Sequence, residues 1–242
     1  MLQTLVQALG GNRYPGRGLL LGCGADGRSA LAAYFLTGRS VNSRNRVLVS
    51  EADGVRTRAF DPALVADPSL ILYAPVRRLP GALVVSNGDH TETIAARLLA
   101  GGTAEAALDT RTFEPDVPHH TPRIAGVARA SGAPWLLAIL RRDAAGACER
   151  AYFPMERPAP GVGYLIHTYA GDGDPLPPFT GAPRAVCLPQ SGARALAEAL
   201  WAALDADNRV ALYACALDAA CGVREEWIIN RLGDGRSDTG GV

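Results

Sequence analysis

The strongest constraint on the fold of this chain is a series of short apolar runs separated by turn residues. Four runs of five to eight residues fill the first third, at 18–23, 30–36, 46–50 and 69–76. Runs of this length that are bounded by Gly, Asn, Asp or Pro predict β-strands. With the Ala-Asp-Gly turn at 25–27 between the first two runs, this third is predicted to be a strand meander.

Two helices are predicted in the middle of the chain. A strand at 83–86 leads through a Ser-Asn-Gly turn into a helix over 89–102, where Asp89 can cap the N-terminus and Glu92 lies three residues further on. A shorter helix follows at 103–108. This order predicts a strand-turn-helix unit.

Strand-like runs return in the second half of the chain. They lie at 123–130, 134–140, 150–155, 162–169 and 210–217. A helix over 190–204, opened by Ser191, precedes the last strand, and a loop rich in Pro, Gly and Asp spans 171–183. We expect the polar segment 233–242 to be a disordered tail.

The order of these elements predicts an α+β domain. Strand meander, helix pair, strand meander and helix give two sheets, each of which needs a helical cover. No repeat or linker divides the chain, since the loop at 171–183 leaves only about sixty residues after it, which is marginal for an independent core. We therefore expect one domain over 1–232, followed by the tail.

Composition and charge restrict the classes of protein to consider. The 242 residues are 48% hydrophobic, with a formal net charge of zero and arginines spread along the chain. No apolar run approaches the roughly 18 residues of a membrane span, no basic stripe indicates a nucleic-acid or membrane surface, and residues 1–18 lack the pattern of a signal peptide. We expect a soluble cytoplasmic protein that binds neither nucleic acid nor membrane.

The absence of lysine and the pattern of cysteines exclude several kinds of chemistry. All 24 basic residues are arginine, which rules out a lysine Schiff base and a Gly-Lys-Ser/Thr phosphate loop. The five cysteines are odd in number and include no CxxC pair. We expect small buried hydrophobic residues rather than a disulfide framework or a zinc site.

Four stretches resemble, in order, the archaeal-type IMP cyclohydrolase family, and a fifth, at the start of the chain, is similar to the opening of bacterial members of this family. They are NRYPGRG at 12–18, GRSVNSRNRV at 38–47, VVSNGDHTETIA at 84–95, TFEPDVPHHTPRIAG at 112–126 and VALYACAL at 210–217. Together they span nearly the whole chain except the tail. The resemblance implies a cofactor-independent homo-oligomer whose substrate is a small purine ribotide.

The resemblance also implies the four-layer αββα fold of the N-terminal-nucleophile hydrolases. Those enzymes attack with a Ser, Thr or Cys freed at the start of the chain, whereas this chain begins Met1-Leu2 and shows no obvious processing site ahead of a nucleophile. The fold would therefore serve a different chemistry, since a fold alone does not determine function.

The reaction implied by the family closes 5-formamidoimidazole-4-carboxamide ribotide to IMP. The carboxamide nitrogen attacks the formyl carbon, and the adduct loses water. Such a site needs a phosphate anchor, restraint of the two reacting groups, a base for the amide and a donor for the formyl oxygen. Restraint alone can contribute about 7–11 kcal/mol in well-oriented intramolecular reactions.

Three residues match the family's catalytic positions. Arg46 could hold the negative charge that develops on the formyl oxygen. Tyr73 could hydrogen-bond the same oxygen or donate a proton as water leaves. Glu114 could orient the carboxamide and accept its proton, provided that burial raises its pKa.

Each of these residues has a structural alternative. Arg46 would be a surface arginine beside a strand, Tyr73 a core residue with its hydroxyl at the rim, and Glu114 a solvated carboxylate or a partner of Arg123. The spacing around Glu114 is one residue longer than the family pattern, and Asp116 is the nearest competitor for its role.

Further residues are predicted to bind the substrate. They are Arg39, Ser40, Asn45, Asn87, Gly88, His90 and Arg123. Ser40 and Asn45 would be neutral ligands of ribose or carboxamide, or would serve an ordinary turn. Asn87 and Gly88 would recognise base or carboxamide, because Asp89 already opposes the positive end of the following helix. The phosphate falls to Arg17, Arg39 or Arg123, which the sequence does not rank.

The histidines do not indicate a metal site. His90, His119 and His120 have neither HxxxH spacing nor a third ligand nearby. We expect His90 in a pocket wall or in the first turn of a helix, and the other two on the loop that carries Glu114. The sequence thus predicts neither a metal nor a cofactor.

Two other functions stay open. An amidase or peptidase could keep N-terminal-nucleophile chemistry after processing, which the mass of the mature protein would reveal. A non-catalytic purine-nucleotide-binding protein on the same fold would bind IMP without cyclising the ribotide.

Overall fold

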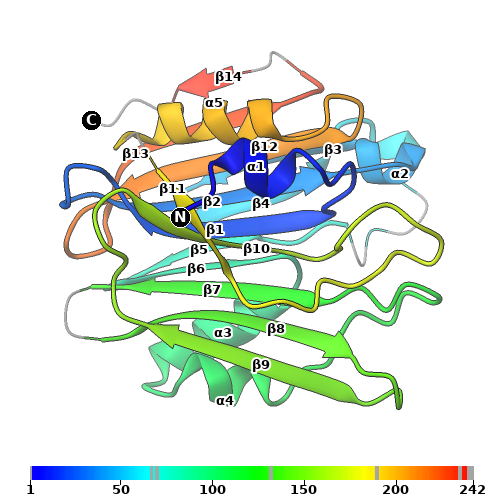
Figure 1. Cartoon of the computed structure of the whole chain (residues 1–242), viewed down its shortest axis with the longest axis horizontal. Helices are drawn as coiled ribbons and strands as arrows, with labels where there is room; N and C mark the ends of the chain where they lie inside the picture. Colours follow the sequence, from blue (N-terminus) through cyan, green and yellow to red (C-terminus); the bar gives the residue numbers. More distant parts are fainter. Residues whose placement is uncertain are drawn as a thin grey trace.

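Two seven-stranded antiparallel sheets make up the body of the protein (Figure 1). The structure, a computed structural model, describes residues 2–65, 68, 71–130, 133–188 and 191–233, together with the backbone of 236–238. The mixed α/β architecture with two antiparallel sheets agrees with the α+β class expected from the order of elements.

The first sheet has the strand order β11-β10-β1-β2-β12-β13-β14. Its strands are β1 (Arg17–Cys23), β2 (Ala30–Thr37), β10 (Val162–His167), β11 (Arg184–Cys187), β12 (Arg209–Leu217), β13 (Val223–Asn230) and β14 (Arg236–Asp238). The central strands are almost entirely apolar because both of their faces are buried. Along β1, Leu19 and Leu21 belong to the core between the sheets, and Leu20 belongs to the core beneath the helices.

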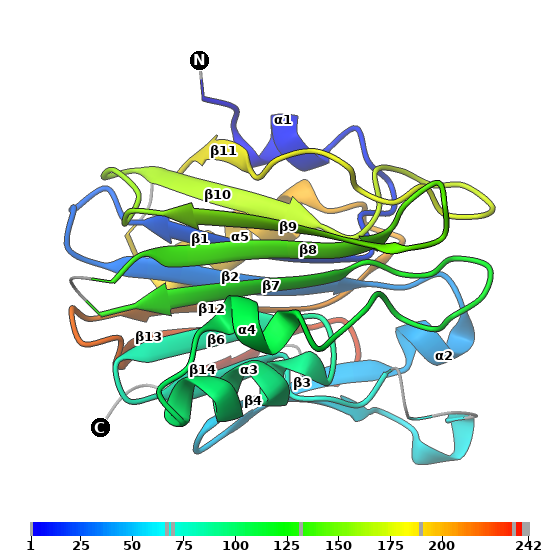
Figure 2. The same ribbon diagram turned by 90° about the horizontal axis from the view of Figure 1, so that it is seen from below.

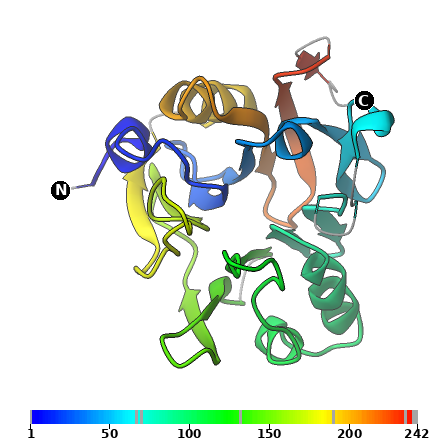
Figure 3. The same cartoon turned by 90° about the vertical axis from the view of Figure 1, so that its right-hand side faces the viewer.

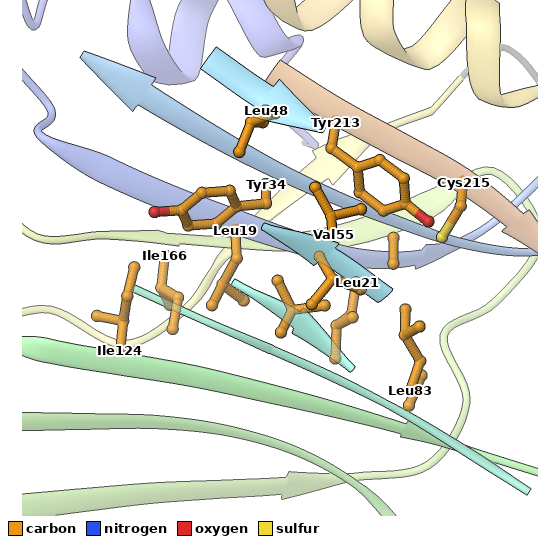
Figure 4. Close-up of a cluster of buried hydrophobic side chains, with 14 of the residues drawn as sticks. Leu19, Leu21, Tyr34, Leu48, Val55, Leu83, Ile124, Ile166, Tyr213 and Cys215 are labelled. Carbon is orange, nitrogen blue, oxygen red and sulfur yellow. The ribbon is translucent and has the colours of Figure 1, made fainter. Parts of the chain in front are cut away.

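The second sheet follows the chain order from β3 to β9. Its strands are β3 (Arg46–Glu51), β4 (Gly54–Ala59), β5 (Val76–Leu79), β6 (Ala82–Ser86), β7 (Arg123–Arg129), β8 (Trp135–Arg142) and β9 (Cys148–Met155). Figure 4 shows the layer where the two sheets meet, with Leu19 and Leu21 of the first sheet facing Leu83 and Ile124 of the second.

Helices lie on the outer faces of both sheets, as Figure 3 shows for the blue and gold helices on one side and the green helices on the other. The helices α1 (Leu5–Leu9) and α5 (Ala193–Ala203) pack on the first sheet, and α3 (His90–Leu99) and α4 (Ala104–Leu108) cover the second sheet (Figure 2). Two short elements, α2 (Val41–Arg44) and η1 (Pro62–Leu64), lie beside β3 and β4. No helix in the described ranges is long and apolar enough to cross a membrane.

Most predicted strands are confirmed, but the strand predicted at 69–76 is wrong over residues 71–75. Residues 71–75 are irregular and the strand begins only at Val76. Thr57 on β4 is the physical reason, because its hydroxyl accepts from the Tyr73 amide (2.8 Å) and its amide donates to the Tyr73 carbonyl (2.9 Å). Positions 69 and 70 lie outside the described residues.

The strand-turn-helix unit at 83–102 is confirmed, but the two predicted helix caps are wrong. The Asp89 side chain makes no capping hydrogen bond, and its carboxylate instead pairs with Arg111 and Arg123. Helix α5 begins at Ala193 after Gly192, because Glu225 of the neighbouring β13 accepts from the first free amides of the helix, at 2.9 and 3.1 Å.

Several elements were not predicted. They are α1, α2, β4, β11 and β13. In β4 and β13, charged residues interrupt the apolar pattern and obscure its period. Within the tail, Arg236–Asp238 pair with β13 as β14, and residues 234–235 and 239–242 lie outside the described part of the chain.

A side chain joins the edge of the second sheet to the first. The amide of Leu48 on β3 donates to Asn230 Oδ1 (2.8 Å), and Asn230 Nδ2 donates to the Leu48 carbonyl (3.0 Å). Because Leu48 is buried, both backbone groups depend on this one amide. Asn230 therefore replaces a neighbouring strand at this point.

We expect Asn230→Ala to lower the free energy of unfolding by about 2 kcal/mol, since it leaves a buried donor and acceptor unpaired. Urea denaturation monitored by circular dichroism measures the change. Arg224→Ala on the same strand is the control, because its side chain is 74% exposed and an exposed ion pair contributes at most about 1 kcal/mol. Equal stability of the two variants would contradict the role of Asn230.

Candidate active site

A pocket of about 500 Å³ opens at the end of the sandwich where β1 begins and β2 ends. Five segments line it, at 14–17, 39–43, 71, 114–121 and 169–176. Strand register brings polar side chains to this end of the inter-sheet layer. Arg17, at the start of β1, is on the same face of its strand as Leu19, and Arg46, at the start of β3, is on the same face as Leu48.

An ion pair between Arg17 and Glu114 lies in the wall of this pocket. Arg17 Nη2 donates to both carboxylate oxygens of Glu114, at 2.7 Å each. The side chains are only 12% and 2% exposed. A buried pair of this kind is stable only because each charge neutralises the other.

Burial raises the pKa of the Glu114 carboxyl, and the positive charges of Arg17 and Arg123 only partly oppose this shift. Burial acts to lower the pKa of Arg17, but Glu114 and the neighbouring Tyr73, Tyr169 and Tyr34 together outweigh it, and the pKa of Arg17 is raised. The arginine is therefore a permanent cation, and Glu114 is the member of the pair that can take up a proton.

The loop that carries Glu114 is held closed by its own side chains. The Glu114 amide donates to the Thr121 carbonyl (2.9 Å). The carboxylate of Asp116 accepts from the Thr121 amide (2.7 Å) and from its hydroxyl. Thr121 in turn contacts the hydroxyl of Tyr169. Asp116 is therefore engaged in shaping the loop, and Glu114 is the carboxylate that faces Arg17.

Two buried tyrosines meet beside Arg17. The hydroxyls of Tyr34 on β2 and Tyr73 lie 2.6 Å apart, and the side chains are 0% and 4% exposed. Ile71, two residues before Tyr73, lines the pocket. Tyr73 itself does not line the pocket. It is packed in the core, as its structural alternative predicted, but its hydroxyl is buried against Tyr34 rather than placed at the rim.

Arg46 is a buried arginine with an incomplete set of partners. It is 2% exposed; Nε donates to the Ser43 carbonyl (2.9 Å), and Nη2 lies 3.5 Å from the Thr37 carbonyl. Its Nη1 is buried without a hydrogen-bond partner. The surface alternative for Arg46 is thereby wrong, and its free N–H groups suit an oxygen or anion that the protein itself does not supply.

Arg39 and Ser40 lie at the mouth of the pocket. The Arg39 guanidinium stacks over the Tyr14 ring at 4.7 Å from its centroid and pairs with Asp172. Ser40 caps α2 by accepting from the Ser43 amide (3.1 Å). Asn42 also lines the pocket, and its Oδ1 has no hydrogen-bond partner.

The side chains of Asn45 and Asn87 form hydrogen bonds with backbone groups. Asn45 exchanges hydrogen bonds of 2.7 and 2.8 Å with the carbonyl and amide of Asp61. Asn87, fully buried, donates to the Pro122 carbonyl (2.9 Å) and accepts from the Ile124 amide (2.7 Å). Neither side chain lines the pocket. The contacts of Asn45 fit its alternative role in a turn, and contact of either asparagine with the substrate stays a prediction.

Arg123, His90 and Gly88 form a separate group under α3. Arg123 alternates on β7 with Ile124 of the inter-sheet core and so faces α3. Its Nη1 donates to Asp89 (2.7 Å) and to His90 Nδ1 (3.0 Å). A side chain at Gly88 would meet Arg123 Nη1 at 2.7 Å. None of the three lines the pocket, although the charge of Arg123 acts on Glu114.

The sequence of this chain matches a known protein family. The model of the family described as IMP cyclohydrolase-like protein matches residues 14–220. The chain belongs to this family. The resemblance predicted from the five stretches is thereby confirmed, and the match includes all ten residues predicted for the site.

Three archaeal relatives carry the name IMP cyclohydrolase. That of Methanopyrus kandleri is 32% identical over 159 residues, which are 64% of this chain and 75% of the relative. Those of Methanothrix thermoacetophila and Thermococcus kodakarensis are 34% and 33% identical, over 54% of this chain and 64% of each relative.

Within the described ranges, no group of three or more His, Cys, Asp or Glu side chains is placed to hold an ion. All five cysteines are free. His119 and His120 lie on the loop after Glu114, as predicted, and His119 Nδ1 accepts from the Leu176 amide (3.2 Å).

Sequence reasoning missed Tyr34, and it missed the pairing of Arg17 with Glu114. Tyr34 lies inside a run of apolar residues, which predicts a core residue, and it is part of the core between the sheets. Arg17 and Glu114 are 97 positions apart, and no local pattern connects them. An inward-facing arginine next to Leu19 was the one available signal, because a buried charge requires a partner.

We expect the protein to lose stability as the pH falls below about 6.5. Burial, followed by the charge of Arg123, lowers the pKa of His90 to about 3, so the unfolded chain binds this proton and the folded protein does not. Stability due to a neutral His90 is complete above the unfolded pKa and is lost as the pH falls from there toward 3.

Urea titrations at pH 7 and pH 5 measure this effect. The His90→Gln variant, whose amide does not titrate, is expected to lose about 2 kcal/mol less than the wild type between these pH values. An identical loss in both proteins would contradict a neutral, buried His90.

Proposed function

We propose that this protein is an IMP cyclohydrolase that closes 5-formamidoimidazole-4-carboxamide ribotide to IMP with loss of water. The observation that carries the proposal is the polar cluster at the pocket end of the inter-sheet layer, where Arg46, Tyr73 and the Arg17–Glu114 pair are buried together. Membership of the IMP cyclohydrolase-like family supports it. We also assign the fold to the four-layer αββα type of the N-terminal-nucleophile hydrolases, on the support of helices outside both sheets.

The cluster offers a donor and an acceptor for both halves of the reaction. In the addition step, the carboxamide nitrogen forms a bond to the formyl carbon, its proton passes to Glu114, and the formyl oxygen takes a proton from Tyr73. In the dehydration step, the formamido nitrogen gives its proton back to Tyr73, and the new hydroxyl takes the proton held by Glu114 and leaves as water. The two steps together return the protein to its starting protonation.

Charge stabilisation is assigned to Arg46. The oxygen that becomes negative during the addition needs fixed donors in a site from which water is excluded. Arg46 has a buried Nη1 without a partner, and no carboxylate is paired with it among the ion pairs of the described residues. Because no carboxylate neutralises its charge, the guanidinium of Arg46 can stabilise the negative charge on this oxygen more strongly than a paired arginine could.

The ribotide phosphate is assigned to Arg39. Of the three arginines considered, Arg17 is committed to Glu114 and Arg123 to Asp89 and His90. Arg39 lines the pocket mouth, and its side chain is 37% exposed. Its pairing with Asp172 is the surface kind that a doubly charged phosphate can displace.

No step in this scheme requires a metal or a cofactor, because acid, base and charge stabilisation all come from side chains. We therefore propose metal-independent turnover, with a small purine ribotide as the substrate. That the protein is a homo-oligomer in the cytoplasm stays a prediction from the family resemblance.

We expect purified protein to form IMP from the formamido ribotide with a chelator present, as measured by ultraviolet absorbance. Arg46→Gln, Tyr73→Phe and Glu114→Gln are each expected to lower kcat at least about 100-fold, since each removes a charge, donor or base from the reacting atoms. Arg44→Gln is the matched control, because Arg44 donates to the Gly38 carbonyl and the Asn208 side chain.

Activity of the control together with loss in the three variants supports the assignment. Wild-type rates in the three variants would contradict the catalytic roles assigned to these residues. IMP binding to the wild type without any cyclisation would replace the proposed enzyme by a nucleotide-binding protein.

We expect Arg39→Gln to raise KM for the ribotide about tenfold with little change in kcat, because one charge-assisted contact to the phosphate is lost. The same variant should behave like the wild type toward the nucleoside that lacks the phosphate. Arg13→Gln is the control, since Arg13 is 66% exposed and pairs with Asp205 and Asp207. Equal effects of Arg39→Gln on ribotide and nucleoside would exclude phosphate recognition by Arg39.

A further inference from the structure

The hydroxyls of Tyr34 and Tyr73 form a hydrogen bond that crosses from one sheet to the other. Tyr34 belongs to β2 of the first sheet, and Tyr73 precedes β5 of the second. Their oxygens are 2.6 Å apart, and either could be the donor. In a layer filled mostly by apolar side chains, such a contact fixes two phenols relative to each other.

The backbone of each tyrosine is fixed by neighbouring residues. Tyr34 pairs with Leu19 of β1 and Tyr213 of β12, and is 0% exposed. The amide and carbonyl of Tyr73 are both bonded to Thr57. Because both tyrosines are buried and held in place, the one thing that can differ is which of the two hydroxyls donates the hydrogen bond.

The direction of that hydrogen is decided when a ligand is bound. A phenol has one hydrogen, so Tyr73 can donate to a substrate oxygen only while it accepts from Tyr34. If Tyr73 donated to Tyr34 instead, its oxygen would offer the substrate no hydrogen. The order Tyr34 to Tyr73 to substrate is the arrangement in which Tyr73 can act as the proton donor of the reaction.

The surroundings of Tyr34 keep its hydroxyl protonated, so that it has a hydrogen to donate. Burial, followed by the neighbouring Tyr73, raises the pKa of Tyr34 well above its usual value, and the cations Arg17 and Arg46 only partly oppose this. Tyr34 is therefore a neutral phenol at any pH at which the protein works. Its hydrogen has the Tyr73 oxygen as its recorded acceptor among the described residues.

We propose that Tyr34 is a positioning residue for the cyclisation, which donates its hydrogen bond to Tyr73 and thereby directs the Tyr73 hydrogen toward the formyl oxygen. This role rests on the proposed function and adds to it a residue that does not touch the substrate. It requires that Tyr34 act only through Tyr73.

The test is a double-mutant cycle on kcat and KM. Tyr34→Phe is expected to lower kcat about tenfold while KM changes less than about twofold, because the hydrogen bond aids the transition state rather than substrate binding. In the Tyr73→Phe background, adding Tyr34→Phe is expected to change kcat by less than about twofold. Protection against thermal unfolding by IMP shows that each variant is folded and binds.

Tyr213→Phe is the matched control. Tyr213 lies beside Tyr34 on the next strand and is 1% exposed. Figure 4 shows its hydroxyl pointing away from that of Tyr34, toward Cys215. The Tyr213→Phe substitution removes a tyrosine hydroxyl from the same core and leaves the Tyr34–Tyr73 hydrogen bond intact. It therefore measures the effect of a purely structural change on kcat. We expect wild-type kcat in this variant.

The outcomes separate the two proposals. Wild-type kcat in Tyr34→Phe overturns the positioning role while leaving the enzyme in place. A tenfold loss that persists in the Tyr73→Phe background, or that Tyr213→Phe shares, also overturns it, since the effect then does not pass through Tyr73. Absence of cyclisation in the wild type overturns the proposed function, and the positioning role with it.

Discussion

The layer between the two sheets is apolar along most of its length, and it becomes polar only at one end of the strands. Residues at alternate positions of β1 and β3 point into this layer, so Arg17 and Arg46 enter it by the same periodicity that places Leu19 and Leu48 there. A buried cation is costly unless a partner or a ligand neutralises it. The polar end of the layer therefore requires both a carboxylate from elsewhere in the chain and a space for something negative or polar.

Glu114 is the carboxylate that meets this requirement. Its loop is fastened by Asp116 and Thr121, so the ion pair with Arg17 is made by a rigid donor and a rigid acceptor. Arg46 forms no ion pair with a carboxylate among the described residues, and its Nη1 is buried without a hydrogen-bond partner. The same sandwich thus provides one neutralised arginine and one that is available.

The residues of the stretches that resemble the family divide into two groups by the face on which they lie. Arg46 lies at the polar end of the inter-sheet layer, and Arg39 lines the mouth of the pocket. His90, at the start of α3, and Arg123, on the outer face of β7, hold the helix against the sheet. A motif that resembles a family therefore contains both chemical and supporting residues, and spacing alone does not separate them.

The sequence by itself determined the strand-rich α+β class, most strand positions, the absence of lysine chemistry and the family to which the chain belongs. These follow from local composition, short-range periodicity and ordered motifs, all of which are readable along the chain. Only the tertiary structure decided that Arg17 pairs with Glu114, that Tyr34 meets Tyr73, and that Asn45 and Asn87 serve the backbone. Those contacts join residues from 16 to 97 positions apart, and they depend on how the two sheets are registered and stacked, which no local pattern encodes.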